Sequence, residues 1–407
     1  MKPLKVTMTN SLVMHYNLHK QMDMVEPYKA TYKDLVNFHS PEYIKFLSTV
    51  SPANENSFLP EVNRFNVKDD CPIFPGLYDY CRSVAGATMM AANKLNSGEY
   101  ETIINWSGGF HHAKVCEASG FCYVNDINLG ILELLKIHNR VLYIDIDVHH
   151  GDGVEEAFYI TDRVMTASFH KYGDFFPGTG RLDDVGFGKG KNYSINVPLK
   201  DGIDDKSYED IFVPVIQKII EVFQPSAILM QCGGDSLSGD RLGCFNLTHA
   251  GHGRCVEFVK SFNLPLILVG GGGYTIDNVA KAWTYETGIV VGSRLDEDIP
   301  YNQYLTYFAP NYKLKIPPMS IENMNTRAET DQIISTIHER LRGLTIAPSV
   351  QMSITPSFLI DEEQIDSDEE FLYERILDDN GFDGERELEQ TERITKTDNL
   401  PQVEKSD

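Results

Sequence analysis

The sequence predicts an α/β fold built on a largely parallel sheet. Short runs rich in Val, Ile and Leu recur between longer segments of helical spacing, and such apolar runs are typical of parallel strands buried on both faces. Most of these runs end in a cluster of polar residues or glycines. Because ligands bind at the carboxyl ends of strands in open α/β sheets, the clusters also predict where the chemistry takes place.

The first part of the chain, residues 1–96, is predicted to be rich in helices. Ser40 and Pro41 form a typical helix start. Small and apolar residues at helical spacing predict a second helix over residues 77–95. Residues 63–75 lie between them, contain two prolines and are predicted to form an irregular loop.

The predicted strands and the helices that link them follow from residue 101 onward. We predict strands at residues 101–106, 140–144, 163–169, 193–197, 226–231 and 264–269. Helices are predicted at residues 127–137 and 208–223. A helix that connects two strands gives the β-α-β unit of a parallel sheet.

The densest cluster of ionisable side chains follows the strand at residues 140–144, in the stretch Y-I-D-I-D-V-H-H-G-D-G. If the chain stays extended there, Asp145, Asp147 and His149 project to one face. A carboxylate and an imidazole two residues apart can bind one divalent cation. A lone Asp-x-His is more often a solvated strand end, but four ionisable groups together favour a metal site.

Three further strands deliver polar groups to the same edge of the sheet. The first leads into two glycines and the pair His111 and His112, an arrangement that directs imidazoles into a cavity. Another ends at Asp235, and the last ends in a glycine run before Tyr274. That run lacks the Gly-Lys-Ser/Thr of a phosphate loop, so we reject nucleotide binding. Together these groups predict a single site.

Composition argues against several classes of protein. The chain has 407 residues, a net charge of −23 and seven cysteines, none of them in a C-x-x-C pair. The charge disfavours direct nucleic-acid binding, and the cysteines indicate a reducing compartment rather than a disulfide framework. The sequence has neither an apolar run of membrane-spanning length nor a signal peptide. Residues 361–407 carry 18 acidic and five basic residues.

Six motifs resemble those of the class I histone deacetylases, in this order: G-G-F-H-H-A-K, A-S-G-F-C-Y-V-N-D, Y-I-D-I-D-V-H-H-G-D-G, F-F-P-G-T-G, G-D-S-L-S-G-D-R-L-G and G-G-G-G-Y-T. The resemblance implies the arginase-deacetylase fold, whose mainly parallel sheet of about eight strands is flanked by helices. It covers residues 1–346, which we expect to form the catalytic domain. Residues 347–407 are expected to be an acidic, mostly disordered tail.

The resemblance implies one zinc ion, with Fe²⁺ as the alternative, bound by Asp147, His149 and Asp235. Three protein ligands leave room for water and the substrate carbonyl. The implied reaction is hydrolysis of N-ε-acetyl-lysine in histones and other proteins. The implied catalytic residues are His112 supported by Asp152, His111 supported by Asp145, and Tyr274 as a donor to the oxyanion.

The resemblance also implies residues that bind the substrate and further ions. The walls and rim of a narrow acyl-lysine tunnel are matched by Asp70, Gly120, Phe121, Phe176 and Leu242. Two structural K⁺ sites are implied, one at Asp145, Asp147, His149 and Phe169, the other at Phe158, Thr161, Val164 and Tyr193. Contacts to inositol phosphate are matched by Lys2 and Arg241.

Three features depart from the family pattern. The family has a tyrosine-rich strand before its Met-Lys-Pro, whereas Met-Lys-Pro opens this sequence, so we expect the first strand to be missing. Lys5 stands where an arginine usually lines the cavity below the metal. Asp277 stands where a basic residue usually contacts inositol phosphate, and its charge predicts weaker activation by that ligand.

The predicted role is chromatin silencing and transcriptional repression in the nucleus, with a cytoplasmic pool. No nuclear import signal is evident in the sequence. The expected partners are acetylated histone tails and corepressor complex subunits. We expect neither membrane binding nor sequence-specific binding of nucleic acid. One alternative is a catalytically impaired scaffold subunit, suggested by the missing strand. Another is a relative that hydrolyses small acetylated amines, or a two-metal ureohydrolase. The intact catalytic groups argue against the scaffold. The single metal-binding set and the class I resemblance along the whole core argue against both the small-amine relative and the ureohydrolase.

Overall fold

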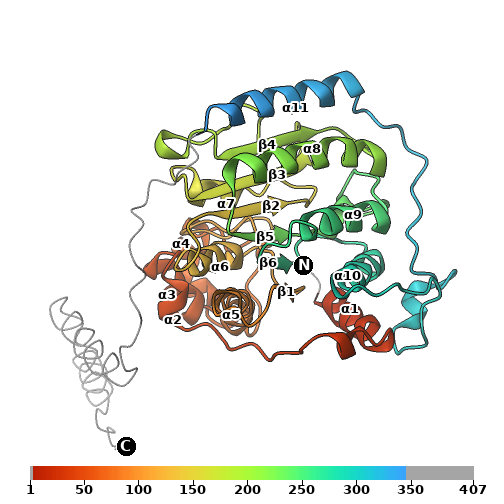
Figure 1. Cartoon of the computed structure of the whole chain (residues 1–407). Helices are drawn as coiled ribbons and strands as arrows, with labels where there is room; N and C mark the ends of the chain where they lie inside the picture. The colour runs from red at the N-terminus through yellow and green to blue at the C-terminus, as the bar shows by residue number, and fades with distance from the viewer. Residues whose placement is uncertain (1–2, 345–407) are drawn as a thin grey trace, which may run out of the picture. The chain divides into compact units, whose positions relative to one another are not determined.

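The computed structural model describes residues 3–344. Its centre is a six-stranded sheet in the order β1-β6-β5-β2-β3-β4, in which every neighbouring pair is parallel (Figure 1). The predicted α/β fold class is therefore confirmed. Lys2, the predicted boundary at residues 346 and 347 and the acidic tail lie outside the described residues.

The six strands correspond to the six predicted apolar runs. They are β1 Thr102–Asn105, β2 Val141–Asp145, β3 Val164–Lys171, β4 Ser194–Leu199, β5 Ala227–Gln231 and β6 Leu266–Val269. The described residues thus contain fewer strands than the eight or so of the family pattern. Three further segments, around residues 204, 237 and 246, pair only through single bridges and do not extend into strands; the bridges are Asp204 with Asn246 and Leu237 with Leu247.

Eleven α-helices are present among residues 3–344. They are α1 Leu4–His15, α2 Tyr32–Leu35, α3 Pro41–Thr49, α4 Leu59–Arg64, α5 Leu77–Asn96, α6 Asp126–Leu134, α7 Asp152–Phe158, α8 Asp205–Phe223, α9 His249–Lys260, α10 Ile276–Val291 and α11 Arg327–Arg342. The helix-rich start of the chain was predicted, as was the start of α3, where the Ser40 hydroxyl accepts a hydrogen bond from the Tyr43 N–H. Among the described residues, no helix is both long and apolar enough to cross a membrane.

Helices cover both faces of the sheet, and alternate residues of each strand face opposite layers. On β2, Leu142 and Ile144 pack with residues of α8, α9, α10 and α11, whereas Val141 and Tyr143 pack with residues of α5, α6 and α7. This period of two is the expected geometry of a strand buried on both faces. Because both faces are covered, solvent and ligands reach the sheet from its edges and strand ends.

The carboxyl ends of the central strands are level with one another. Asp145 at the end of β2 pairs with Gln231 of β5, and Gln231 pairs with Val269 of β6. Val269 in turn pairs with Asn105 at the end of β1. The four loops that follow these strands therefore begin at the same level of the sheet, which brings their polar clusters together.

Candidate active site

Asp147, His149 and Asp235 lie at the centre of the site formed by these loops. One ligand atom from each side chain lies within 4.8 Å of the others, and all three side chains are buried. His149 Nδ1 is 3.0 Å from Asp147 Oδ1 and 3.2 Å from Asp235 Oδ2. Since β2 ends at Asp145, Asp147 and His149 belong to the loop beyond the strand rather than to an extended strand.

The three side chains fit a divalent cation. Asp235 Oδ2 is buried and accepts no hydrogen bond from the described residues. Burial and the charge of Asp147 raise the pKa of Asp235 to about 7. Burial opposes a charge on His149, yet the two carboxylates raise its pKa to about 10. Two buried carboxylates beside one imidazole create a negative potential that a bound cation would neutralise.

The surrounding backbone and one amide fix the two carboxylates. Gln231 Nε2 and the Gly272 N–H each donate to Asp147 Oδ2 over 2.9 Å. The Val148 N–H donates to Asp235 Oδ1, also over 2.9 Å. A Cβ atom at Gly272 would lie only 1.9 Å from Asp235 Oδ2, so this position has room for glycine alone. The carboxylates are therefore held in place by the protein itself.

Two histidine–carboxylate pairs lie beside this centre. His111 Nδ1 is 2.7 Å from Asp145 Oδ2, and His112 Nδ1 is 2.7 Å from Asp152 Oδ1. The two imidazole rings are 3.9 Å apart between centroids. Because each Nδ1 is paired with a carboxylate, it carries the hydrogen, and the Nε2 atom of a neutral ring is left as the acceptor.

The two histidines differ in their affinity for a proton. Burial and the neighbouring His111 lower the pKa of His112 to about 4, despite the opposing effect of Asp152. Burial acts in the same direction on His111, but the charges of Asp145 and Asp147 outweigh it and raise the pKa of His111 to about 9. A neutral His112 can accept a proton at neutral pH, whereas His111 favours the charged form.

Tyr274 completes a small cavity with these groups. The cavity is lined by Gly109, His111, His112, Gly120, Cys122, Asp147, His149, Gly272 and Tyr274. Burial, together with the charges of Asp235 and Asp147, raises the pKa of Tyr274 well above its ordinary value. The phenol therefore stays protonated and can donate a hydrogen bond in the cavity.

Aromatic side chains surround the cavity. The rings of Phe176 and His112 are 5.0 Å apart, and those of Phe121 and Tyr274 are 5.8 Å apart. Gly120 lies between two of these groups, since a Cβ atom there would be 2.5 Å from His112 and 2.9 Å from Phe176. The structure thus brings three of the predicted wall residues to the cavity.

Two predicted wall residues, Phe176 and Leu242, and the predicted rim residue Asp70 are more open to solvent. Phe176 and Leu242 expose 44% and 47% of their surfaces, and Asp70 is exposed on the loop between α4 and α5. Exposed apolar side chains beside a polar cavity are typical of a ligand-binding rim.

Comparison with known proteins agrees with this arrangement. A family model described as the histone deacetylase domain matches residues 1–290. The chain belongs to the histone deacetylase family. It is 58% identical over 379 residues to histone deacetylase clr6 of Schizosaccharomyces pombe, covering 92% of this chain and 94% of that protein.

Animal members of the histone deacetylase family are similarly close. Histone deacetylase HDAC1 of Drosophila melanogaster is 56% identical over 368 residues, which cover 90% of this chain and 71% of the relative. Human histone deacetylase 1 is also 56% identical, over 356 residues that cover 88% of this chain and 74% of the relative. The predicted class I resemblance and the predicted enzyme class, a lysine deacetylase, are confirmed, and the scaffold alternative is not favoured.

The first set of residues matched to the deacetylase family's K⁺ sites overlaps the metal-binding residues, and the second lies before β3. Those of the first K⁺ site, including Phe169, lie at the ends of β2 and β3, where Asp145 pairs with Ser168. In the second set, the Thr161 N–H donates to the Phe158 carbonyl over 3.3 Å. The Tyr193 carbonyl accepts a hydrogen bond from the Thr166 N–H, and Val164 is the first residue of β3. The second set thus includes the turn before β3, whereas the first set joins the ends of β2 and β3.

The residues matched to inositol phosphate contacts are described only in part. Arg241 is exposed, and Lys2 lies outside the described residues. Asp277, in the first turn of α10, lies 3.3 Å from the Lys281 ammonium. The carboxylate that departs from the deacetylase pattern is therefore paired within its own helix.

Lys5, the other departure, is a buried residue of α1 that supports the glycine run. Its ammonium donates to the carbonyls of Gly271, Gly272 and Gly273 over 2.7, 2.8 and 3.3 Å. Burial lowers the pKa of Lys5 to about 8, against the opposing charges of nearby carboxylates. In place of the usual arginine, a lysine thus holds the backbone that leads to Tyr274.

Several supporting residues were not predicted from the sequence. The Tyr143 hydroxyl donates to Asp145 Oδ2 over 2.6 Å, and the Lys114 ammonium is 2.8 Å from Asp152 Oδ2. Asp240 accepts hydrogen bonds from the N–H groups of Tyr274 and Thr275, and the Phe175 ring stacks on His149 at 5.0 Å. The sequence offers one signal for three of these residues: the recognised motifs include or adjoin Tyr143, Lys114 and Asp240.

Proposed function

We propose that this chain hydrolyses N-ε-acetyl-lysine in histones and other proteins with a zinc ion bound by Asp147, His149 and Asp235. The observation that carries the proposal is a cavity lined by Asp147, His149, His111, His112 and Tyr274, with the carboxylates of Asp235, Asp145 and Asp152 bonded or close to these side chains. These are the groups that amide hydrolysis needs: a Lewis acid, a general base and a donor to the oxyanion. Membership of the histone deacetylase family supports the same reaction.

The donor set suits Zn²⁺ as the ion, with Fe²⁺ as the alternative. One imidazole nitrogen and two carboxylates are the hard and borderline ligands that both ions accept, and no thiolate takes part. Three protein ligands are typical of a catalytic rather than a structural zinc site. When bound, the ion acts as a Lewis acid that polarises the acetyl carbonyl and lowers the pKa of the attacking water.

His112 is the proton-transfer group. Its Nδ1–H is held by Asp152, so the neutral ring presents Nε2 to the cavity as an acceptor. His112 takes a proton from the attacking water and later gives it to the leaving ε-amine of lysine. The low pKa of His112 keeps the ring neutral before reaction, and Asp152 stabilises the charge that the ring acquires during it.

Tyr274 and His111 stabilise charge that develops on the substrate. The protonated Tyr274 phenol donates a hydrogen bond to the acetyl oxygen as that oxygen becomes negative, and such a donor is worth about 3–4 kcal/mol in other enzymes. His111, held by Asp145, keeps a positive potential beside His112. That potential favours negative charge in the transition state over the neutral amide.

The aromatic walls select an acylated side chain. The methylene stem of acetyl-lysine passes between Phe121 and Phe176, while Gly120 leaves the space that the stem needs. A free lysine ammonium would lose its hydration in this passage without gaining a partner, and this cost disfavours it. Leu242 and Asp70 act at the rim, where Asp70 holds the backbone of the substrate.

The K⁺ sites matched at the strand ends and at the turn before β3 have a structural role in this proposal. Inositol phosphate binding through Lys2 and Arg241 is proposed to be weak, because Asp277 brings negative charge towards a polyanion. Corepressor subunits are the proposed partners, and the nucleus is the proposed place of action. The nuclear place of action is supported by the names of the relatives, which are histone deacetylases.

The proposal is tested by comparing two substrates of the same purified chain. We expect release of acetate from an acetyl-lysine histone peptide, with kcat/KM at least about 100-fold above that for a small acetylated diamine. The control substrate contains the same scissile amide but has no peptide backbone that Asp70 at the rim could bind. Equal kcat/KM values for the two would favour the small-amine alternative, and no hydrolysis of either would overturn the proposal.

A further inference from the structure

A buried acid–base pair lies behind the metal-binding loops and takes no part in the steps above. His252 on α9 and Glu286 on α10 are both fully buried. His252 Nδ1 is hydrogen-bonded to Glu286 Oε1, and His252 Nε2 lies 3.1 Å from the carbonyl oxygen of Gly233. The imidazole thus bridges α10 and the loop that follows β5.

The three bonded groups determine where the protons lie. The Gly233 carbonyl can only accept, so the Nε2 atom of His252 carries a hydrogen and donates it. One further proton lies between Nδ1 and Glu286 Oε1. Whether that proton is closer to the ring or to the carboxylate, the pair as a whole is neutral. A neutral pair avoids much of the cost of burying a net charge.

Gly233 links this pair to both carboxylates of the metal site. Its N–H donates to Gln231 Oε1 over 2.7 Å, and Gln231 Nε2 donates to Asp147 Oδ2. A Cβ atom on Gly233 would lie 2.0 Å from Asp147 Oδ2, so its backbone packs directly against that carboxylate. The short turn Gly234–Ser236, which carries Asp235, begins at the next residue.

A second residue of α10 supports the same loop. Trp283 precedes Glu286 by three residues and therefore lies on the same side of the helix. Its indole N–H donates to the Cys232 carbonyl over 2.8 Å. Its ring stacks on Trp106, with centroids 5.3 Å apart and planes 4° apart. Trp283 of α10 and His252 of α9 thus hold two successive carbonyls of the loop after β5, and Glu286 of α10 holds His252 in turn.

We propose that His252 and Glu286 are positioning residues for the metal site. They hold the Gly233 carbonyl so that Asp147 and Asp235 keep the separation that one cation requires. Neither residue touches the substrate, and their effect passes through Gly233 and Gln231. This inference rests on the proposed function in one respect, that the site binds Zn²⁺.

Zinc affinity, measured by competition with a chromophoric chelator, tests the proposal on the full chain. His252→Phe keeps a ring of similar shape but removes both hydrogen bonds. We expect zinc affinity to fall 10- to 100-fold, the usual effect of losing a residue that orients metal ligands. With zinc in excess, kcat should recover towards the wild-type value and KM for an acetyl-lysine peptide should stay unchanged.

Two substitutions of Glu286 separate the hydrogen bond from the packing. The amide of Glu286→Gln can donate to Nδ1 of a neutral His252, so zinc affinity should stay within about threefold of wild type. Glu286→Ala leaves the ring unsupported, and we expect a loss of about tenfold or more. These variants also keep the proposal testable if His252→Phe does not fold.

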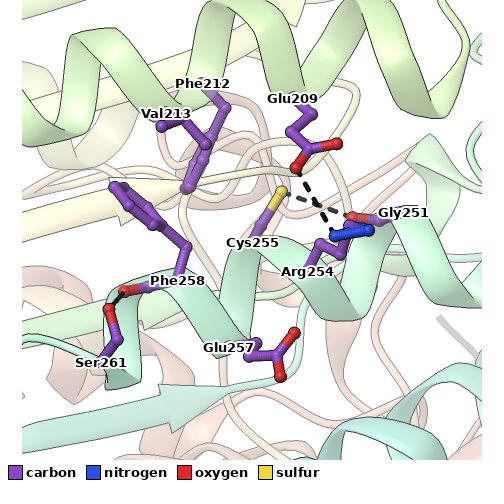
Figure 2. A pocket seen from close by; sticks show the side chains of 9 residues that line it. All are labelled: Glu209, Phe212, Val213, Gly251, Arg254, Cys255, Glu257, Phe258 and Ser261. Atoms are coloured by element: carbon purple, nitrogen blue, oxygen red, sulfur yellow. Dashed lines mark hydrogen bonds and ion pairs between the residues drawn. The ribbon is translucent and has the colours of Figure 1, made fainter.

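Cys255→Ala is the matched control. Cys255 is a buried residue of α9 that faces the groove between α8 and α9, whose lining includes Phe212 and Phe258 (Figure 2). Its thiol donates to the Gly251 carbonyl. Removing the thiol should lower thermal stability through lost packing but leave zinc affinity unchanged.

The outcomes are distinct. Zinc affinity that is unchanged in both His252→Phe and Glu286→Ala overturns the positioning role. An equal loss in Cys255→Ala also overturns it, because the effect would then be general destabilisation of α9. A wild-type chain that binds no zinc would overturn the proposed function itself and this inference with it.

Discussion

At the floor of the site, Asp147 and Asp235 expose 1% and 0% of their surfaces. Phe176 and Leu242, the exposed tunnel residues that form the rim in our proposal, expose 44% and 47%. The floor carboxylates accept hydrogen bonds from backbone N–H groups and, at Asp147, from Gln231. The rim side chains meet solvent and make apolar or aromatic contacts.

The difference shows where the protein determines geometry and where it leaves the substrate to adapt. A floor side chain cannot move without breaking contacts in a neighbouring loop, so a small chemical change there should disturb binding of the metal or catalysis strongly. A rim side chain has few such contacts, and its loss should change affinity for the substrate modestly. Four substitutions and one pH profile test this contrast.

The largest effect is expected from Asp235→Asn at the floor. A neutral amide is a poorer metal ligand than a carboxylate, so zinc affinity should fall by more than about 100-fold and activity at trace zinc should disappear. Asp201→Asn is the control, because Asp201 pairs with Lys171 away from the cavity. Unchanged zinc content in Asp235→Asn would remove Asp235 from the site.

Tyr274→Phe should have the next largest effect. Only a hydroxyl is removed, so the fold and zinc content should remain while kcat falls by about 10²–10³, as for other oxyanion donors. Initial-rate assays with an acetyl-lysine peptide measure the fall in kcat, and metal analysis of the same sample is the control. Near wild-type turnover would exclude the assigned role of Tyr274.

The pH profile of kcat/KM tests the role of His112 as the general base. Because the pKa of His112 is lowered to about 4, His112 is neutral and competent as a base at pH 5–8 and loses activity only as pH falls towards 4. Asp152→Asn removes the carboxylate that stabilises the charged ring and should lower kcat by about 10- to 100-fold. A limb of kcat/KM near pH 6.5 that shifts in Asp152→Asn would contradict this assignment.

The smallest effect is expected from Leu242→Ala at the rim. The side chain is half exposed, so stability should change by less than about 0.5 kcal/mol. We expect KM for the peptide to rise severalfold and kcat to stay within about twofold. Ile160→Ala, a substitution at an exposed residue just after α7, is the control. A large loss of kcat in Leu242→Ala would show that the rim shapes the reacting groups as well.

The strands and their terminal clusters could be predicted because the signal is local. A continuous apolar run marks a strand buried on both faces, and β5 ends at Gln231, the residue at which its run ends. Parallel strands place their carboxyl ends together, which explains why separate motifs could be assigned to one site. The start of α8 was predicted three residues late, because its cap, Asp204, lies before the amphipathic pattern begins.

The supporting contacts could not be predicted because they join residues far apart in the chain. The Lys5 ammonium reaches Gly271 across 266 positions, and His252 meets Glu286 across 34. Neither contact leaves a periodic pattern in the sequence. Lys5 and His252 are ordinary helix residues until the sheet brings α1, α9 and α10 against the strand-end loops.

The most direct test of the central claim is a titration of the metal-depleted chain with Zn²⁺, in which acetate release from an acetyl-lysine histone peptide is followed at each step. The side chains of Asp147, His149 and Asp235 can hold one ion, so activity should rise linearly and reach its plateau at one zinc per chain. Full activity without metal would contradict the account. A chain loaded with one zinc that releases no acetate would contradict it equally.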